Sequence, residues 1–424
     1  MTIQESIKQW MRQNETNGIR LLQKLVGEAS TRGNEYKAQA VIMEKCRELG
    51  LTMDIFDVDE TNVHEHELFS CDRKDFKNQP NVIATWNGTG GGRSIILNSH
   101  IDVVPAGDGA NWTHPPFQPK VIDGRCYGRG TTDMKGGTVS LLLAMEALKS
   151  LNISLKGDVV FQSVIEEESG GTGTLSAVVR GYKADGALIP EPTNMKLFPK
   201  QQGSMWFRIA IKGKSAHGGT RYEGVNAIMK ATQVMQALQQ LEAKRNKRIV
   251  DPLYEEVPIP VPINIGKIQG GEWPSSVPDL VTLEGRIGVA PNETNETVQE
   301  EFETEIAEFS RRDEWLKDHL PTVEWFGGCW QAGDLPEGHL LMAMLEDCYQ
   351  DVLDETPIAQ ASPWGTDGGV LWKAGKIPVV IFGPGTTEVA HDSDEYIELQ
   401  QMFRCAEVYA SMLLNWCEVS DLTD

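Results

Sequence analysis

The sequence predicts an α/β domain with a mainly parallel central sheet, and a smaller, ferredoxin-like α+β domain that is inserted into its chain. Strand patterns alternate with helical patterns up to about residue 202, which is typical of a parallel sheet covered by helices. From residue 203 the expected order changes to β-α-β-β-α-β, the order of a ferredoxin-like unit. After residue 327 the first style resumes. We therefore expect one domain from residues 1–202 and 328–424, and an inserted domain from residues 203–327.

The first domain is predicted to begin with helices at 5–28 and 35–49, followed by strands at 81–86 and 94–97. The glycine run at 88–92 is expected to be a hairpin turn, because no helix with a Lys-Ser/Thr pair follows it as in a phosphate loop. The further elements expected here are helix 136–150, strand 157–164, helix 173–180 and strand 186–189.

The inserted domain is predicted from six elements that alternate in pattern. They are strand 205–212, helix 225–244, strands 262–268 and 280–289, helix 293–312 and strand 322–325. The chain then returns to the first domain with helix 338–353, strand 379–382 and helix 399–416.

Composition and charge exclude several classes of protein. With 40% hydrophobic and 24% charged residues, the chain is a globular protein and neither disordered nor fibrous. Its net charge of −22 disfavours nucleic acid and anionic membranes as partners. The seven cysteines are scattered without a CxxC pair, so we expect reduced thiols rather than disulfides or a thiolate metal site. Without a leader pattern or a long apolar span, we expect a cytoplasmic, soluble protein.

Histidines and carboxylates follow the predicted strands, where ligands bind in open α/β sheets. Without thiolates, such side chains suit Zn, Co or Mn rather than a structural cysteine site. Paired His and Asp also occur in structural networks, and the run Glu166-Glu-Glu168 could be a solvated acidic tip. The residues in question are His100, Asp102, Asp133, Glu166, Glu167, Glu168, Glu191 and His391.

Several segments strongly resemble the M20 metallopeptidase family, in the acetylornithine deacetylase and succinyl-diaminopimelate desuccinylase branch. The resemblance runs from about residue 80 to the C-terminus and implies a metallopeptidase-type catalytic domain with an inserted lid and dimerisation domain. The segments are Ser99-His-Ile-Asp-Val-Val-Pro105, Gly128-Arg-Gly-Thr-Thr-Asp-Met-Lys-Gly-Gly137, Glu166-Glu-Glu-Ser-Gly-Gly171, Glu191-Pro-Thr193, Ser215-Ala-His-Gly-Gly219 and the late His391.

The resemblance implies a centre of two divalent metal ions. His100 and Glu191 would hold one metal, Glu168 and His391 would hold the other, and Asp133 would bridge both. Zinc is the expected metal, with cobalt or manganese as alternatives.

The resemblance also implies two supporting catalytic roles. Asp102 would orient His100, and Glu167 would act as the general base. The three consecutive glutamates leave the register open by one residue, and we align Glu167 and Glu168 with the base and ligand because Ser-Gly-Gly follows them. Glu166 is then a flanking acid.

Further residues resemble substrate-contacting positions of the family. His217 would stabilise the oxyanion in the partner's site across a lid dimer, with an exposed loop histidine as the alternative. Arg286 would grip a substrate carboxylate, with a structural ion pair as the alternative. Asn264 and the backbone of Gly365 and Thr366 are weaker matches of the same kind.

The expected function is removal of an acyl group from a small N-acyl amino acid or related amine by a homodimer. Alternatives with the same mechanism are a dipeptidase or carboxypeptidase and a deformylase of formylated pyrimidines. A different class, a catalytically inactive binding relative, is disfavoured because all five ligand positions and the base are present. Four tryptophans could line an aromatic acyl pocket or belong to packing: Trp206, Trp273, Trp330 and Trp364.

Overall fold

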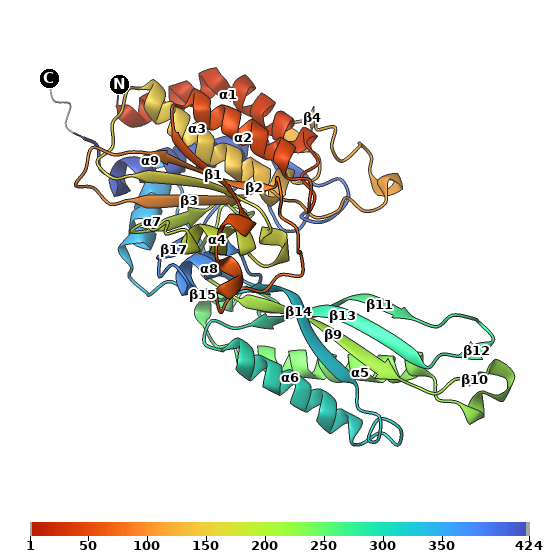
Figure 1. The fold of residues 1–424 in the computed structure, drawn as a ribbon. Helices are drawn as coiled ribbons and strands as arrows, with labels where there is room; N and C mark the ends of the chain where they lie inside the picture. Colours follow the sequence, from red (N-terminus) through yellow and green to blue (C-terminus); the bar gives the residue numbers. More distant parts are fainter. Residues whose placement is uncertain (1, 421–424) are drawn as a thin grey trace.

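A nine-stranded sheet forms the centre of the larger part of the molecule (Figure 1) in the computed structural model, which describes residues 2–420. The pairs β6–β3, β3–β7 and β7–β17 are parallel, whereas β1, β2 and β15 add antiparallel at the edges. In sheet order the strands are β1 (Thr52–Asp57), β2 (Pro80–Trp86), β6 (Val159–Val164), β3 (Ile95–His100), β7 (Ala187–Ile189), β17 (Val379–Ile381), β8 (Leu197–Gln201) and β15 (Gly333–Asp334), with β16 (Ala359–Ser362) beside β8.

Helices cover both faces of this sheet, because its central strands are apolar on both sides. In β3, Ile95 and Leu97 pack into one buried cluster, and Ile96 packs into another on the opposite face. The helices that contribute side chains to the first cluster include α1 (Ile3–Gly27), α2 (Tyr36–Glu48), α3 (Gly136–Ser150), α7 (Leu340–Leu353) and α9 (Leu399–Trp416). Ala177 of α4 (Thr172–Val179) and Leu371 of α8 (Asp367–Lys373) pack into the second cluster. This arrangement confirms the predicted α/β class.

A four-stranded antiparallel sheet forms the smaller part of the molecule. Its order is β11 (Ile263–Gly270), β13 (Leu280–Val289), β9 (Gly203–Lys212) and β14 (Thr322–Trp330), and α5 (Ala227–Asn246) and α6 (Asn295–Ser310) cover one face. Strand β9 alternates, so that Phe207 and Ile209 are buried beneath these helices while Trp206 and Arg208 point to the other face. The chain order β-α-β-β-α-β is the one predicted. Strand β14 is longer than predicted and runs to Trp330 through an irregularity in its pairing.

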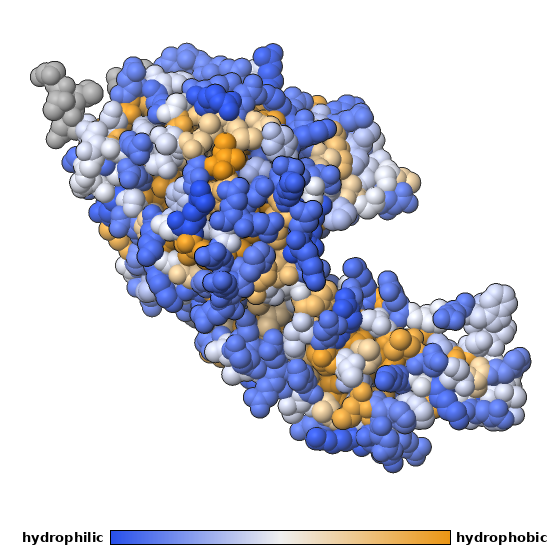
Figure 2. Space-filling view, viewed as in Figure 1, coloured by the Kyte–Doolittle hydropathy of each residue, from blue (hydrophilic) through white to orange (hydrophobic). Residues whose placement is uncertain are grey.

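Two crossings join the parts, one between β8 and β9 and one between β14 and β15. The smaller part extends away from the larger one and ends at β10 (Ala216–His217), which pairs with β12 (Ser276–Val277) (Figure 1). A hollow separates the body of the larger part from this far end (Figure 2). The exact limits at residues 202 and 327 remain a prediction.

The remaining strands form a small three-stranded sheet. They are β4 (Lys120–Ile122), β5 (Arg125–Tyr127) and β18 (Tyr396–Glu398). All seven cysteines are unpaired. Among residues 2–420, no helix is long and apolar enough to cross a membrane.

Candidate active site

His100 is the last residue of β3, and its side chain is almost fully buried. Its Nδ1 lies 2.9 Å from the backbone carbonyl of Asp102. Since a carbonyl can only accept, the ring carries its proton on Nδ1 and leaves Nε2 free to bind a metal or a proton. The carboxylate of Asp102 lies farther from the same ring nitrogen, at 3.8 Å. The ring of His100 is therefore in closer contact with the backbone of Asp102 than with its carboxylate.

The carboxylate of Asp102 has another set of contacts. It accepts hydrogen bonds from the backbone N–H groups of Glu167 at 3.3 Å and Glu168 at 3.1 Å. Burial raises the pKa of Asp102 to about 8. Asp102 thus connects the turn after β3 with the turn that carries both glutamates.

Asp133 lies between the two histidines. One carboxylate oxygen is 3.1 Å from Nε2 of His100, and the other is 3.3 Å from Nε2 of His391. Glu191 approaches the first histidine, with an oxygen 3.7 Å from His100 Nε2. Glu168 approaches the second, with an oxygen 3.3 Å from His391 Nε2. The five predicted ligands are therefore brought together as two groups that share Asp133.

Negative charge is in excess in this cluster. Burial raises the pKa of the Glu167 and Glu191 carboxyls well above the usual value, and neighbouring carboxylates add to the effect. Burial also opposes ionisation of Asp133, but hydrogen bonds from both histidines hold its pKa below its usual range. Within the described residues, no lysine or arginine forms an ion pair with Asp102, Asp133, Glu167, Glu168 or Glu191.

The donor atoms are also close enough to share metal ions. Those of His100, Asp133 and Glu168 lie within 4.8 Å of one another, as do those of His100, Glu167 and Glu191. Imidazole and carboxylate donors are the ligands that zinc, cobalt and manganese accept. The residues present therefore fit divalent cations, which would also neutralise the excess charge.

The three consecutive glutamates point in different directions. Glu166 has a left-handed backbone (φ 62°), and its buried carboxylate forms ion pairs with Arg32 at 2.8 Å and Arg73 at 2.6 Å. Glu167 and Glu168 instead line a cavity together with Asp133, Glu191 and His391. Glu166 is thus held by arginines outside this cavity.

Glu395 is a supporting residue that we did not predict. Its buried carboxylate accepts hydrogen bonds from the backbone N–H groups of Gly130, Thr132 and Asp133, at 3.0, 2.9 and 3.3 Å. Arg129 donates to the same carboxylate at 2.6 Å. Glu395 therefore holds the loop that presents Asp133. The only local signal is an acid four residues after His391, directly before the short strand β18.

The candidate site opens into a cavity of about 410 Å³. Its walls combine the cluster carboxylates with aromatic side chains and one arginine. The lining residues include Asp133, Glu167, Glu168, Glu191, His391, Ser204, Trp206, Arg286, Trp330, Trp364 and Gly365.

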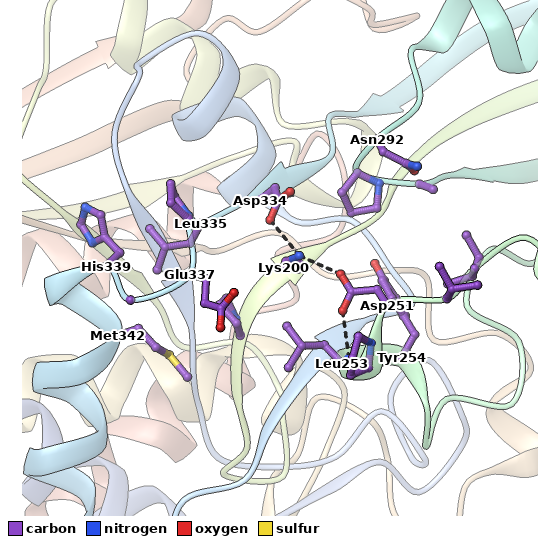
Figure 3. Close-up of a pocket in the computed structure, with 18 of the residues that line it drawn as sticks. Lys200, Asp251, Leu253, Tyr254, Asn292, Asp334, Leu335, Glu337, His339 and Met342 are labelled. Carbon is purple, nitrogen blue, oxygen red and sulfur yellow. Dashed lines mark hydrogen bonds and ion pairs between the residues drawn. The ribbon is translucent and has the colours of Figure 1, made fainter.

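A larger cavity of about 680 Å³ lies elsewhere, where β8 meets the segment 248–254 and the start of α7 (Figure 3). Lys200 lines this cavity and pairs with Asp251 at 2.7 Å and Asp334 at 3.3 Å. Neither group of close metal donors lies there. We therefore place the chemistry in the smaller cavity.

The predicted substrate-contacting residues differ in position. Arg286 lines the cavity, and its Nε and Nη2 atoms are buried without a hydrogen-bond partner in the described part of the chain. Asn264 is exposed on β11, opposite Arg286 in the strand register. Gly365 also lines the cavity. Thr366 is buried, and its hydroxyl donates to Gln201 at 2.6 Å and caps α8.

His217 lies far from this cavity within the same chain. It is exposed on β10, at the far end of the smaller part (Figure 1). Its Nδ1 accepts a hydrogen bond from the backbone of Gly219 at 3.0 Å. The fold of one chain therefore does not bring His217 to the cluster.

Histidines and carboxylates converge at the strand ends of an α/β sheet, and an α+β domain is inserted in the chain. This arrangement is typical of metal-dependent hydrolases. Residues 96–415 match the model of Peptidase family M20/M25/M40, and the chain belongs to this family. The predicted family resemblance is thereby confirmed.

Known relatives include enzymes that remove acyl groups. The N-formyl-4-amino-5-aminomethyl-2-methylpyrimidine deformylase of Halalkalibacterium halodurans is 32% identical over 406 residues, covering 91% of this chain and 90% of the relative. A probable succinyl-diaminopimelate desuccinylase of Staphylococcus aureus (strain MRSA252) is 28% identical over 355 residues, covering 77% and 84%. The di-peptidase Dug1p from Saccharomyces cerevisiae shares the fold, with a TM-score of 0.81, 14% identity and coverage of 99% and 100%.

Proposed function

We propose that this protein is a hydrolase that uses two divalent metal ions to cleave the amide bond of a small N-acyl amine. The observation that carries this proposal is the carboxylate of Asp133, with one oxygen 3.1 Å from His100 and the other 3.3 Å from His391. A carboxylate placed in this way can serve two metals at once. The deacylases among the known relatives support the same reaction class.

Each proposed metal has its own residues. His100 and Glu191 would hold one ion, Glu168 and His391 would hold the other, and Asp133 would bind both. Two bound cations lower the pKa of a water molecule and polarise the scissile carbonyl. Zinc suits these donors, with cobalt or manganese as alternatives.

Glu167 is the proposed general base. It would take a proton from the attacking water and return it to the nitrogen of the departing amine, which is a poor leaving group without that proton. Its position supports this role, because it lines the cavity and one of its oxygens lies 4.0 Å from Nε2 of His100.

Arg286 favours a substrate that carries a carboxylate, such as an N-acyl amino acid. Among the described residues, two buried nitrogen atoms of its guanidinium have no hydrogen-bond partner, and burying them this way is costly unless a ligand accepts their hydrogen bonds. A planar carboxylate can accept two of them at once.

A formylated aminopyrimidine is a second candidate substrate. Trp206, Trp330 and Trp364 line the cavity and offer flat surfaces on which an aromatic ring can stack. The name of the deformylase relative gives such a compound as its substrate. Turnover of a panel of N-acetyl, N-succinyl and N-formyl amino acids, dipeptides and a formylated aminopyrimidine separates the two candidates. We expect the highest kcat/KM with a carboxylate-bearing substrate.

Replacing Arg286 tests the same choice from the protein side. Arg286→Met should raise KM for a carboxylate-bearing substrate by about 10- to 100-fold, because hydrogen bonds to a charged group are lost. The methyl ester of that substrate is the matched control, and its KM should hardly respond. An equal response of acid and ester would exclude carboxylate recognition by Arg286.

The protein is also proposed to act as a homodimer through residues 203–327, which we take as the lid domain. Large apolar side chains are exposed on elements toward its far end: Tyr222 (80%), Met229 (61%), Ile268 (52%) and Trp273 (69%). Exposed apolar side chains that gather in one region are typical of an interface. The position of His217 among these elements supports its proposed reach into the partner's cavity.

The unpaired cysteines fit the reducing cytoplasm, where we expect the enzyme to act.

Mixing two inactive variants tests this arrangement. His217→Ala should lower kcat by roughly 10²–10³-fold without loss of metal, because one oxyanion donor is removed. When mixed with Glu167→Gln, heterodimers should form in which one site carries both lesions and the other neither, so about half the activity per heterodimer should return. If subunit exchange is demonstrated and no activity returns, His217 does not act across a dimer.

A further inference from the structure

Trp330 makes a direct contact with the proposed base. It is the last residue of β14, and its indole Nε1 donates to the backbone carbonyl of Glu167 at 2.9 Å and to the side-chain Oε1 at 3.1 Å. The other carboxylate oxygen, Oε2, is the one that lies 4.0 Å from Nε2 of His100. The two oxygens of Glu167 are therefore in different surroundings, one fixed by the indole and one facing the histidine cluster.

The hydrogen bond restricts a side chain that otherwise has few anchors. Asp102 accepts from the N–H of Glu167, and Trp330 donates to its carbonyl and its side chain. A glutamate side chain has several rotatable bonds, so holding it in one orientation costs conformational entropy, which the hydrogen bonds must offset. A buried carboxylate also needs hydrogen-bond donors, and no lysine or arginine among the described residues forms an ion pair with this one.

Trp330 is itself held firmly. Its side chain is 9% exposed, and its ring lies 5.8 Å from that of Trp206, centroid to centroid. Two glycines leave room for it. A Cβ atom added to Gly328 would come within 2.6 Å of the indole ring, and one added to Gly365 would come within 2.6 Å of the Cβ of Trp330. The donor therefore has little freedom to move away from Glu167.

We propose that Trp330 is a positioning residue for catalysis, which anchors Oε1 of Glu167 so that Oε2 faces the reacting water. The inference rests on the proposed function, in which Glu167 moves the proton. Proton transfer requires the carboxylate oxygen within hydrogen-bond reach of the water, so a freely rotating glutamate would be misaligned for much of the time. The indole N–H supplies the alignment from β14, the strand that leads back to the catalytic sheet.

Trp330→Phe removes the N–H donor and keeps an aromatic ring. With the best substrate of the panel above, kcat should fall by about 10- to 100-fold, as is typical when a group that orients a catalytic residue is lost. KM should stay within about threefold, since phenylalanine keeps an aromatic ring in the cavity wall. The affinity for Zn²⁺, measured by competition with a chelator, should also be unchanged, because Glu167 is not a proposed ligand.

Trp416→Phe is the matched control. Trp416 is also buried and also donates from its indole, to the backbone carbonyl of Ser94 at 2.9 Å, but it does not line the cavity. Its replacement should lower the stability of the fold and leave kcat unchanged. If both variants lower kcat equally, the effect of Trp330 is structural and the proposal is wrong.

A double-mutant cycle isolates the contact with Glu167. In a Glu167→Gln background there is no base to align, so Trp330→Phe should cost less than about twofold in kcat. An undiminished loss in that background, or a normal kcat for Trp330→Phe alone, would overturn the inference. A normal kcat for Glu167→Gln alone would instead remove the base from the proposed function, and with it the premise of this inference.

Discussion

Glu167→Gln is expected to lower kcat by about 10²- to 10⁴-fold while the protein still binds two metal ions. Glutamine has nearly the same shape as glutamate but cannot accept the proton of the attacking water, and general acid–base catalysis typically contributes a factor of this size. Trp330 can still donate to the amide oxygen, so the fold around the site should be retained. Steady-state kinetics and metal analysis of the same sample measure both quantities.

The neighbouring glutamates provide matched controls. Glu168→Gln should weaken metal binding, because Glu168 approaches His391 in the cluster. Glu166→Gln should reduce stability, because Arg32 and Arg73 would lose a buried charged partner. If Glu168→Gln kept both metals and lost kcat while Glu167→Gln lost metal, the two roles would be exchanged.

The sequence predicts the central strands of the larger sheet well and its edges poorly. Strands β3, β6 and β17 are buried on both faces, so their continuous apolar runs are visible without any partner. Strand β1 was not predicted, because only one of its six residues is fully buried and its pattern is weak. Strand β8 contains Pro199, which argues against a strand in a sequence but is tolerated near a sheet edge.

The candidate ligands were predictable because each follows a strand or lies in a glycine-rich turn, and the topology of the sheet brings those places together. His100 ends β3, and Glu191 follows β7, the next strand in the sheet. The residues that hold the site were not predictable in the same way. Glu395 contacts the loop of Asp133 from 262 residues away, and Trp330 contacts Glu167 across 163 residues. No local pattern marks such contacts.

The direction of each glutamate in the run 166–168 was equally hidden. Three identical side chains in succession carry no periodic signal, and their directions depend on a left-handed residue and on two arginines from distant segments. Arg32 and Arg73 precede the run by 134 and 93 residues. The structure thus adds what surrounds each carboxylate, and a functional role for each can be proposed from those surroundings.

Removal of metal is expected to abolish activity altogether. The cluster carboxylates would be left with uncompensated charge, and no cation would be present to lower the pKa of water or polarise the carbonyl. Treatment with a chelator, followed by removal of the chelator, should give inactive protein. Adding Zn²⁺ or Co²⁺ back should restore activity. Adding Ca²⁺ should not, because Ca²⁺ prefers a larger number of ligands, all of them oxygen atoms.

Titration of this metal-free protein with Zn²⁺, with bound metal and hydrolysis of the best N-acyl substrate measured on the same samples, tests the central claim most directly. The account predicts that activity is absent at the start and reaches its maximum when two zinc ions are bound per chain. Full activity in thoroughly metal-free protein would contradict metal-dependent hydrolysis, and a maximum at one bound ion would contradict the proposed pair of metals that share Asp133.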